Sequence, residues 1–141
     1  MTIFRRSCLV ACLLIGASPA LAQEAGLATP NLVLRETLDS MPTGPRQEIR
    51  VLTASFRPGD RTVFHSHRSP VTVYVLHGTF TLELADRPPV EVRAGQALVE
   101  PANVAMTGYN RSTSEPLQVV IFYVSEPGTP FLDPLVPDAS R

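Results

Sequence analysis

PGDRTVFHSHRSPVTVYVLHG, residues 58–78, contains all three histidines of the chain, and its composition indicates the class of fold. Val, Thr, Phe and Tyr dominate this stretch, and Pro and Gly interrupt it, which is the pattern of short β-strands joined by turns. His65 and His67 are two residues apart, so on a strand their side chains leave the same face. Two imidazoles that converge from one rigid strand provide half of a metal site.

The chain on both sides of this stretch repeats the same pattern. We predict strands at residues 32–38, 48–56, 62–67, 71–76, 79–85, 90–93, 96–100, 104–109 and 117–124. Beyond residue 22, no segment of ten or more residues has the periodicity of a helix. Short strands separated by Pro and Gly turns predict an all-β sandwich or barrel, in which closure of the sheets removes exposed strand edges.

Residues 1–22 have the layout of a secretory signal peptide: Arg5 and Arg6, an apolar run at 8–17, and a small-x-small site at Ala20–Ala22. The apolar run is shorter than the roughly 20 residues that span a bilayer. We therefore expect cleavage after Ala22, a periplasmic or secreted protein and no stable membrane anchor after cleavage. The alternatives are a buried N-terminal helix or a membrane anchor, and the twin-arginine route remains open beside the general one.

The remaining chain divides into three parts by composition. Residues 23–31 are small and polar and are expected to form a flexible leader, and residues 32–125 carry the predicted barrel strands. Residues 126–141 contain four prolines among apolar residues, which forbids a central strand. This tail is expected to lie along the barrel or along a partner subunit, with a disordered end as the alternative.

Composition excludes several classes of function. Both cysteines, Cys8 and Cys12, fall in the signal segment, so the mature chain has neither a disulfide nor a thiolate ligand. All 12 basic residues are arginine, and without lysine neither Schiff-base chemistry nor a P-loop is available. The formal net charge is −1 and the arginines are scattered, so nucleic acid is not an expected partner.

Two groups of residues resemble the two motifs of the cupin family. The first motif, G-x5-H-x-H-x3–4-E-x6-G, is matched by Gly59, His65, His67 and Gly78, and the second, G-x5-P-x-G-x2-H-x3-N, by Gly95, Pro101 and Asn110. The resemblance implies a double-stranded β-helix, or jelly-roll cupin barrel. It also implies a metal (Fe, Mn, Ni, Cu or Zn) that three histidines and a glutamate would hold, and a homodimer, since cupins commonly pair through strands.

The chain departs from the family at two of the four implied ligands. The position of the family's glutamate is occupied by Val71, or by Thr72 at the other permitted spacing, and the position of its third histidine by Met106. The thioether of Met106 is a soft ligand that, with two imidazoles, would suit copper. Glu100, next to Pro101 at a predicted strand end, is a second candidate for a ligand or a general base.

Two metal-free interpretations stay open beside the metal site. In one, the histidines supply hydrogen bonds or acid–base chemistry to a small molecule in the barrel lumen. Val63, Val71 and Val73 are then expected to line the pocket, and Arg68 at its rim would recognise a carboxylate, although a solvated rim arginine is commoner. In the other interpretation, His65 and His67 are structural.

The sequence thus predicts an exported small cupin with a lumen-facing histidine pair that binds one divalent or copper ion, a small metabolite, or both. The alternative is a metal-dependent cupin enzyme, of the oxygenase or isomerase type by family analogy, that uses His65 and His67 with substitute ligands. The fold alone does not choose between them, because one fold hosts many functions.

Overall fold

A computed structural model describes residues 26–85 and 87–136, and within these ranges the regular structure consists of strands alone. The strands are β1 (Glu48–Phe56), β2 (His65–Ser66), β3 (Val71–His77), β4 (Thr79–Leu84), β5 (Val90–Arg93), β6 (Ala97–Glu100), β7 (Met106–Tyr109), β8 (Leu117–Ser125) and β9 (Asp133–Pro134). The predicted all-β class is confirmed. In the described part of the chain, no helix is long and apolar enough to cross a membrane.

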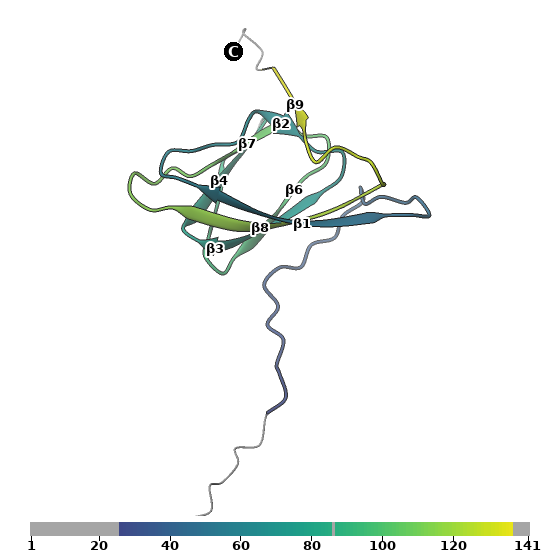
Figure 1. Ribbon diagram of the computed structural model, residues 1–141, viewed down its shortest axis with the longest axis horizontal. Helices are drawn as coiled ribbons and strands as arrows, with labels where there is room; N and C mark the ends of the chain where they lie inside the picture. Colours follow the sequence, from purple (N-terminus) through teal and green to yellow (C-terminus); the bar gives the residue numbers. More distant parts are fainter. Residues whose placement is uncertain (1–25, 86, 137–141) are drawn as a thin grey trace, which may run out of the picture. The chain divides into compact units, whose positions relative to one another are not determined.

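The strands form two antiparallel sheets that face each other (Figure 1). One sheet has the order β1-β8-β3-β6 and the other the order β5-β4-β7-β2-β9. The chain passes repeatedly from one sheet to the other, so strands that are distant in sequence become neighbours, as β1 and β8 do along nine paired residues. This is the arrangement of a jelly roll, as predicted.

The hydrophobic core lies between the two sheets. Alternation along β3 shows why the chain folds this way: Val71, Val73 and Val75 are buried, while Thr72 and Tyr74 between them are partly exposed. Side chains of the other strands complete the core: Phe80, Leu82, Val92, Leu98, Met106, Leu117, Val119 and Tyr123.

Gly78 joins β3 to β4 in a conformation that other residues rarely adopt. Its φ angle is 79°, and a Cβ atom at this position would lie 2.5 Å from the carbonyl oxygen of Pro116. Glycine is therefore required both by the left-handed backbone and by the close approach of the neighbouring chain. The turn carries the chain from β3 of the first sheet to β4 of the second.

The predicted strand at residues 32–38 is absent. No strand pairs with this segment among the described residues, and Leu32 is 66% exposed. Leu34 and Leu38 are half-buried and line a surface hollow with Leu98, so the segment contacts the barrel through side chains and not through a hydrogen-bonded ladder. The apolar residues of this segment therefore mark a contact with the barrel, but they do not form the predicted strand.

The predicted strand at residues 62–67 is reduced to β2, which contains two residues. An isolated bridge joins Arg61 to Tyr109, whereas His65 pairs with Met106. The segment that leads into β2 thus has one residue more than its partner between the two pairings, which is the definition of a bulge. The bulge breaks the alternation of side chains before His65.

The C-terminal tail lies along the barrel, which confirms the first part of that expectation. β9 pairs with β2 at the edge of the second sheet, where the ring of Pro134 interrupts no central ladder. The amide of Leu135 donates a hydrogen bond to the carbonyl oxygen of Phe64 at 2.9 Å. Residues 137–141 and the predicted signal peptide, residues 1–22, lie outside the described residues. Residues 26–30 belong to a separate unit and carry no regular structure.

Candidate metal centre

His65 and His67 are both buried and face the same interior space, as their spacing predicted. His65 lies in β2, where it pairs with Met106 on one side and Pro134 on the other. His67 follows β2 directly, and its side chain is 1% exposed. The third histidine, His77, is exposed at the end of β3.

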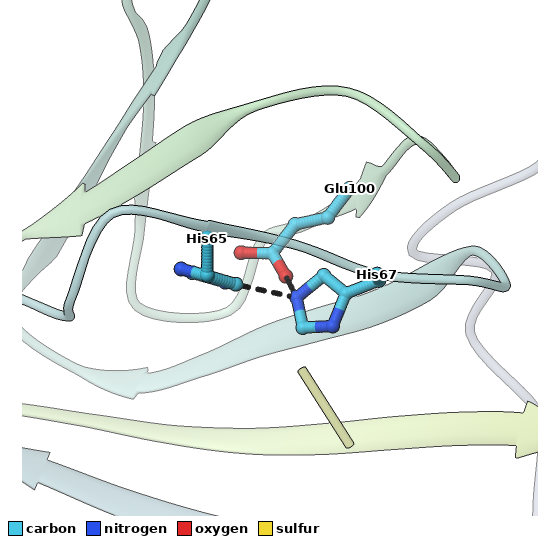
Figure 2. A group of neighbouring side chains, drawn as sticks. All are labelled: His65, His67 and Glu100. Carbon is cyan, nitrogen blue, oxygen red and sulfur yellow. Dashed lines mark hydrogen bonds and ion pairs between the residues drawn. The ribbon is translucent and has the colours of Figure 1, made fainter. Parts of the chain in front are cut away.

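Glu100 completes a cluster of three potential metal ligands with the two histidines (Figure 2). The Nε2 atoms of His65 and His67 are 3.0 Å apart, and Oε2 of Glu100 is 3.0 Å from Nε2 of His67. One ligand atom from each residue lies within 4.8 Å of the others. Two imidazoles and one carboxylate are a recognised donor set for divalent transition metals.

Strand pairing explains why Glu100 reaches the histidines. Glu100 is the last residue of β6, and in the antiparallel pairing of β6 with β3 it lies directly opposite Val71. Directly paired residues project from the same face of a sheet, so Glu100 points into the barrel as Val71 does. Both residues are buried, and Glu100 is 6% exposed. The structure therefore brings together three of the four predicted ligands.

Backbone carbonyl groups set the protonation of both rings. Nδ1 of His65 is 2.7 Å from the carbonyl oxygen of Val63, and Nδ1 of His67 is 2.6 Å from the carbonyl oxygen of Phe131. A carbonyl oxygen only accepts hydrogen bonds, so each Nδ1 carries the proton and donates it. In the neutral ring the Nε2 atom then presents a lone pair, which is the form that binds a metal.

The cluster consequently concentrates acceptors where a cation is required. Two Nε2 lone pairs and a carboxylate oxygen meet at hydrogen-bond distance, and acceptors at such separations repel one another unless a cation lies among them. That cation is either a proton shared within the cluster or a metal ion. Burial lowers the pKa of His65 from its usual value, and the neighbouring His67 lowers it further, against opposite effects of Val63 and Glu100. A neutral His65 suits a metal ligand.

Met106 lies next to His65 in the second sheet. It is the register partner of His65 in β7, and its side chain is 1% exposed. The cross-strand pairing puts the two side chains on the same face. His65 lines the apolar cavity beside the cluster, whereas Met106 is not among the lining residues.

Of the four residues predicted to form the ligand pocket, three do not line the cavity. Val63 is 58% exposed, because the bulge before His65 shifts it out of the inward phase. Arg68 is exposed and does not face the lumen; its guanidinium donates two hydrogen bonds, of 2.8 and 2.9 Å, to the carboxylate of Asp133. Val71 is fully buried in the core, and Val73 lines the cavity as predicted.

The C-terminal segment supplies the site residues that the sequence did not reveal. The backbone oxygen of Phe131 accepts the hydrogen bond of His67, and its ring lies 5.1 Å from the imidazole, measured between centroids. Tyr123 packs edge-on against Phe131 from β8. The only signal in the sequence was the apolar character of this segment among its prolines, which indicates contact with the barrel but no contribution to a site.

An apolar cavity of about 120 Å³ adjoins the three potential ligands. The residues around it come from both sheets and from the C-terminal segment: Ala54, Phe56, Thr62, His65, His67, Val73, Phe80, Glu100, Val119, Ile121, Phe131 and Leu132. Apart from Thr62 and the three clustered residues, this lining is apolar. An apolar cavity with a few polar groups is a usual form of a small-molecule site.

The sequence of the barrel matches a known protein family. Residues 52–123 match the sequence pattern of the family described as the cupin domain. The match covers half of the chain, and the chain therefore belongs to the cupin family, as its two motifs implied. The chain matches no curated protein.

Several solved structures share the fold. One is the DMSP lyase DddQ from Ruegeria pomeroyi DSS-3, with a TM-score of 0.55 and 15% identity, over 64% of this chain and 45% of that one. The polyketide cyclase RemF from Streptomyces resistomycificus has a TM-score of 0.52 and 21% identity, over 64% of this chain and 63% of that one. A cupin with a double-stranded β-helix fold from Methanocaldococcus jannaschii has a TM-score of 0.50 and 25% identity, over 56% of this chain and 70% of that one. This chain thus spans less than half of DddQ, and the likeness shows the double-stranded β-helix fold.

Proposed function

We propose that this protein is an exported cupin that binds one divalent metal ion through Nε2 of His65, Nε2 of His67 and the carboxylate of Glu100. The observation that supports the proposal is the meeting of three buried acceptors whose protonation is set by the carbonyl groups of Val63 and Phe131. A bound metal would satisfy all three at once, and the hydrogen-bonded Nδ1 atoms are the usual outer support of such ligands. The donor set suits Zn²⁺ or Fe²⁺. Cu²⁺ also binds imidazole ligands, and the thioether of Met106 would favour Cu⁺ if it joined them.

Metal analysis of the purified chain tests the proposal. The protein is stripped with a chelator, incubated separately with Zn²⁺, Fe²⁺ under anaerobic conditions, Mn²⁺, Ni²⁺ and Cu²⁺, desalted and analysed by mass spectrometry of the elements. We expect one metal ion per chain in the wild type and loss of the metal in His67→Ala and Glu100→Gln. His77→Ala is the matched control, because it removes an exposed histidine and is expected to leave the metal content unchanged.

Two results would overturn the metal site. One is a wild-type protein that stays metal-free with all five ions, in which case His67 and Glu100 form a metal-free ion pair. The other is metal that persists in a His65→Ala/His67→Ala double variant, because the metal would then be bound elsewhere.

A metal-dependent enzyme is the second candidate, and the cavity favours it. Three protein ligands leave further coordination positions, and the adjoining space is an apolar cavity rather than a fourth His, Cys, Asp or Glu in the described part of the chain. Metal sites of enzymes keep such an open position, whereas structural sites are closed. Cupin oxygenases or isomerases are the expected kinds.

Nitric oxide probes the open position directly. Added to the Fe²⁺-loaded protein, it should give the electron paramagnetic resonance signal of an iron–nitrosyl complex with half-integer spin. If the Fe²⁺ is retained and no nitrosyl complex forms, the metal has no free position and the enzymatic candidate is rejected.

Export is part of the proposal and is supported by the arrangement of residues 1–22. Expression of the full chain in a bacterium, followed by fractionation and N-terminal sequencing, should recover a protein that begins at Gln23 outside the cytoplasm. A cytoplasmic protein that keeps residues 1–22 would reject this part and leave the metal site unaffected.

A further inference from the structure

The cavity beside the metal centre is small and is lined mainly by aromatic and aliphatic side chains. Phe56 and Phe80 meet edge-on with ring centroids 6.2 Å apart, and both line the cavity. Ala54 and Val119, paired across β1 and β8, form part of the same wall. The C-terminal segment contributes a further aromatic wall through Phe131. Such a lining favours the apolar part of a ligand, because apolar side chains remove its surface from water and make dispersion contacts with it.

Few polar groups line this cavity. They belong to the metal centre and to Thr62, and the hydroxyl oxygen of Thr62 already accepts a hydrogen bond of 3.0 Å from the amide of Gly108. No arginine is among the lining residues, and the chain has no lysine. A charged group on a ligand, placed away from the metal, would therefore be buried without a partner, which is strongly unfavourable. A ligand that fits has one polar end, directed at the metal.

The volume limits the apolar part of the ligand. An apolar protein cavity of about 150 Å³ holds a benzene molecule, which has six non-hydrogen atoms. The cavity here measures about 120 Å³, so it is of the size of one ring and not of two fused rings. A second ring would have to displace Phe56 or Phe80 from packed positions in the core region.

We infer that the site takes a compact ligand with one ring-sized, uncharged apolar body and a single oxygen or sulfur donor that binds the metal. The inference rests on the proposed metal centre and adds the class of molecule that the centre serves. It excludes ligands with a second charged end, such as dicarboxylic acids and phosphorylated sugars, because the cavity offers their remote charge no partner.

Benzenethiol on the Co²⁺-loaded full chain is the direct probe, because a thiolate bound to Co²⁺ gives an absorption band that reports binding. Benzenethiol should produce the band, with saturation at one molecule per chain. 2-Naphthalenethiol, which carries a second ring, and 2-mercaptoethanesulfonate, which carries a remote charge, should each bind at least about tenfold more weakly, since the loss of even one matched contact in an apolar pocket changes affinity by 10- to 200-fold.

Two adjacent residues of β1 provide a matched pair of variants. Ala54 faces the cavity, whereas Thr53 faces the opposite side of the strand and is exposed. Ala54→Phe should fill the cavity and weaken benzenethiol binding by about tenfold or more while Co²⁺ content stays at one per chain. Thr53→Phe should bind benzenethiol like the wild type. Ala54→Leu, a smaller change, serves the same purpose if Ala54→Phe does not fold.

The outcomes separate the ligand class from the metal centre. Co²⁺ binding with equal affinity for the one-ring and two-ring thiols, or with unchanged affinity in the folded Ala54 variant, overturns the ligand class and leaves the metal centre intact. Co²⁺ binding without any thiolate band does the same. A chain that binds neither Co²⁺ nor the other metals overturns the proposed function, and the ligand class is rejected with it.

Discussion

Glu100 lies directly opposite Val71 in the pairing of β6 with β3, and both side chains enter the same interior face. Val71 occupies the position at which the cupin motif carries its glutamate. The carboxylate that is missing from β3 is therefore present on the neighbouring strand, one inter-strand spacing away, and its Oε2 atom is 3.0 Å from Nε2 of His67. In this chain, the residue at the glutamate position of the motif, Val71, is not the residue that supplies the carboxylate, Glu100.

Exchange of the two residues tests this relationship. Glu100→Val should weaken metal binding by more than about 100-fold, beyond the 10–100-fold effect of losing an outer support of a metal ligand. The double variant Val71→Glu/Glu100→Val should regain part of the affinity, because the carboxylate returns to the same face from the adjacent strand. Chelator competition measures both values. Equal affinity in Glu100→Val and the double variant would show that Val71 does not face the metal.

The sequence predicted those parts of the site that depend on local alternation. The i, i+2 spacing of His65 and His67 was sufficient to place both imidazoles on one face, and alternation in β3 identified Val73 as a lining residue. The role of Glu100 depends on the register between β3 and β6, which are separated by the β4–β5 hairpin of the other sheet, and local pattern carries no information on such a register.

The parts that were missed have equally specific physical reasons. The hydrogen bond from His67 to Phe131 uses a backbone oxygen, which every residue possesses, so no residue type could indicate it. Val63 was placed in the lumen by counting back from His65, and a bulge of one residue invalidates that count. Strand alternation is thus a reliable guide only where the pairing is regular.

Met106 offers a second test of the ligand set. The proposed ligands are His65, His67 and Glu100, so Met106→Leu, which keeps the volume and removes the thioether, should bind metal with the affinity of the wild type within about twofold. Met106→His restores the residue of the family motif opposite His65 and should bind more tightly, since four protein ligands would then be available. Loss of Cu²⁺ alone in Met106→Leu would instead assign the thioether to a copper site.

The ion pair between Arg68 and Asp133 is expected to support the metal centre from outside. It fixes β9, two residues after the carbonyl group that accepts the hydrogen bond of His67. Arg68→Ala should therefore weaken metal binding by about tenfold, the lower end of the effect of losing an outer support. The charge-exchanged variant Arg68→Asp/Asp133→Arg should recover affinity.

Arg57→Ala is the matched control for that experiment, because Arg57 is also exposed and pairs with an acidic residue, Asp60, away from the site. It should bind metal like the wild type. The supporting role of the ion pair is refuted if Arg68→Ala and Arg57→Ala have the same affinity. Exposed ion pairs contribute little to overall stability, so the melting temperatures of both variants should stay close to the wild type.

The outer face of β1 supports the expectation of a homodimer. Ile49 and Val51 are 72% and 60% exposed there, and Val51 pairs with the partly exposed Phe122 of β8. β1 is also an edge strand, with a free ladder available to a second copy. Light scattering at micromolar concentration should give twice the mass of the chain, and Val51→Glu should give the monomer. Val136→Glu changes an exposed apolar residue elsewhere and should remain dimeric; a monomeric wild type rejects the prediction.

Stability of the metal-free protein should depend on pH through His65. Burial lowers its pKa in the folded protein, whereas in the unfolded chain the pKa is near 6.5. At a pH between the two values, the unfolded chain binds more protons than the folded one, so the free energy of unfolding rises with pH in this window and falls as the pH drops below about 6.5. The loss due to this residue is at most about 1.4 kcal/mol per pH unit.

Urea unfolding at pH 7.5, 6.5 and 5.5 in the presence of a chelator measures this dependence. His65→Asn should reduce the fall in the free energy of unfolding between pH 6.5 and pH 5.5, because no imidazole at position 65 then has to be kept neutral on folding. His77→Asn removes an exposed histidine and should keep the wild-type pH dependence. Identical pH profiles for the wild type and His65→Asn would mean that His65 is as easily protonated in the folded protein as in the unfolded chain, and burial would then not be what keeps the ligand neutral.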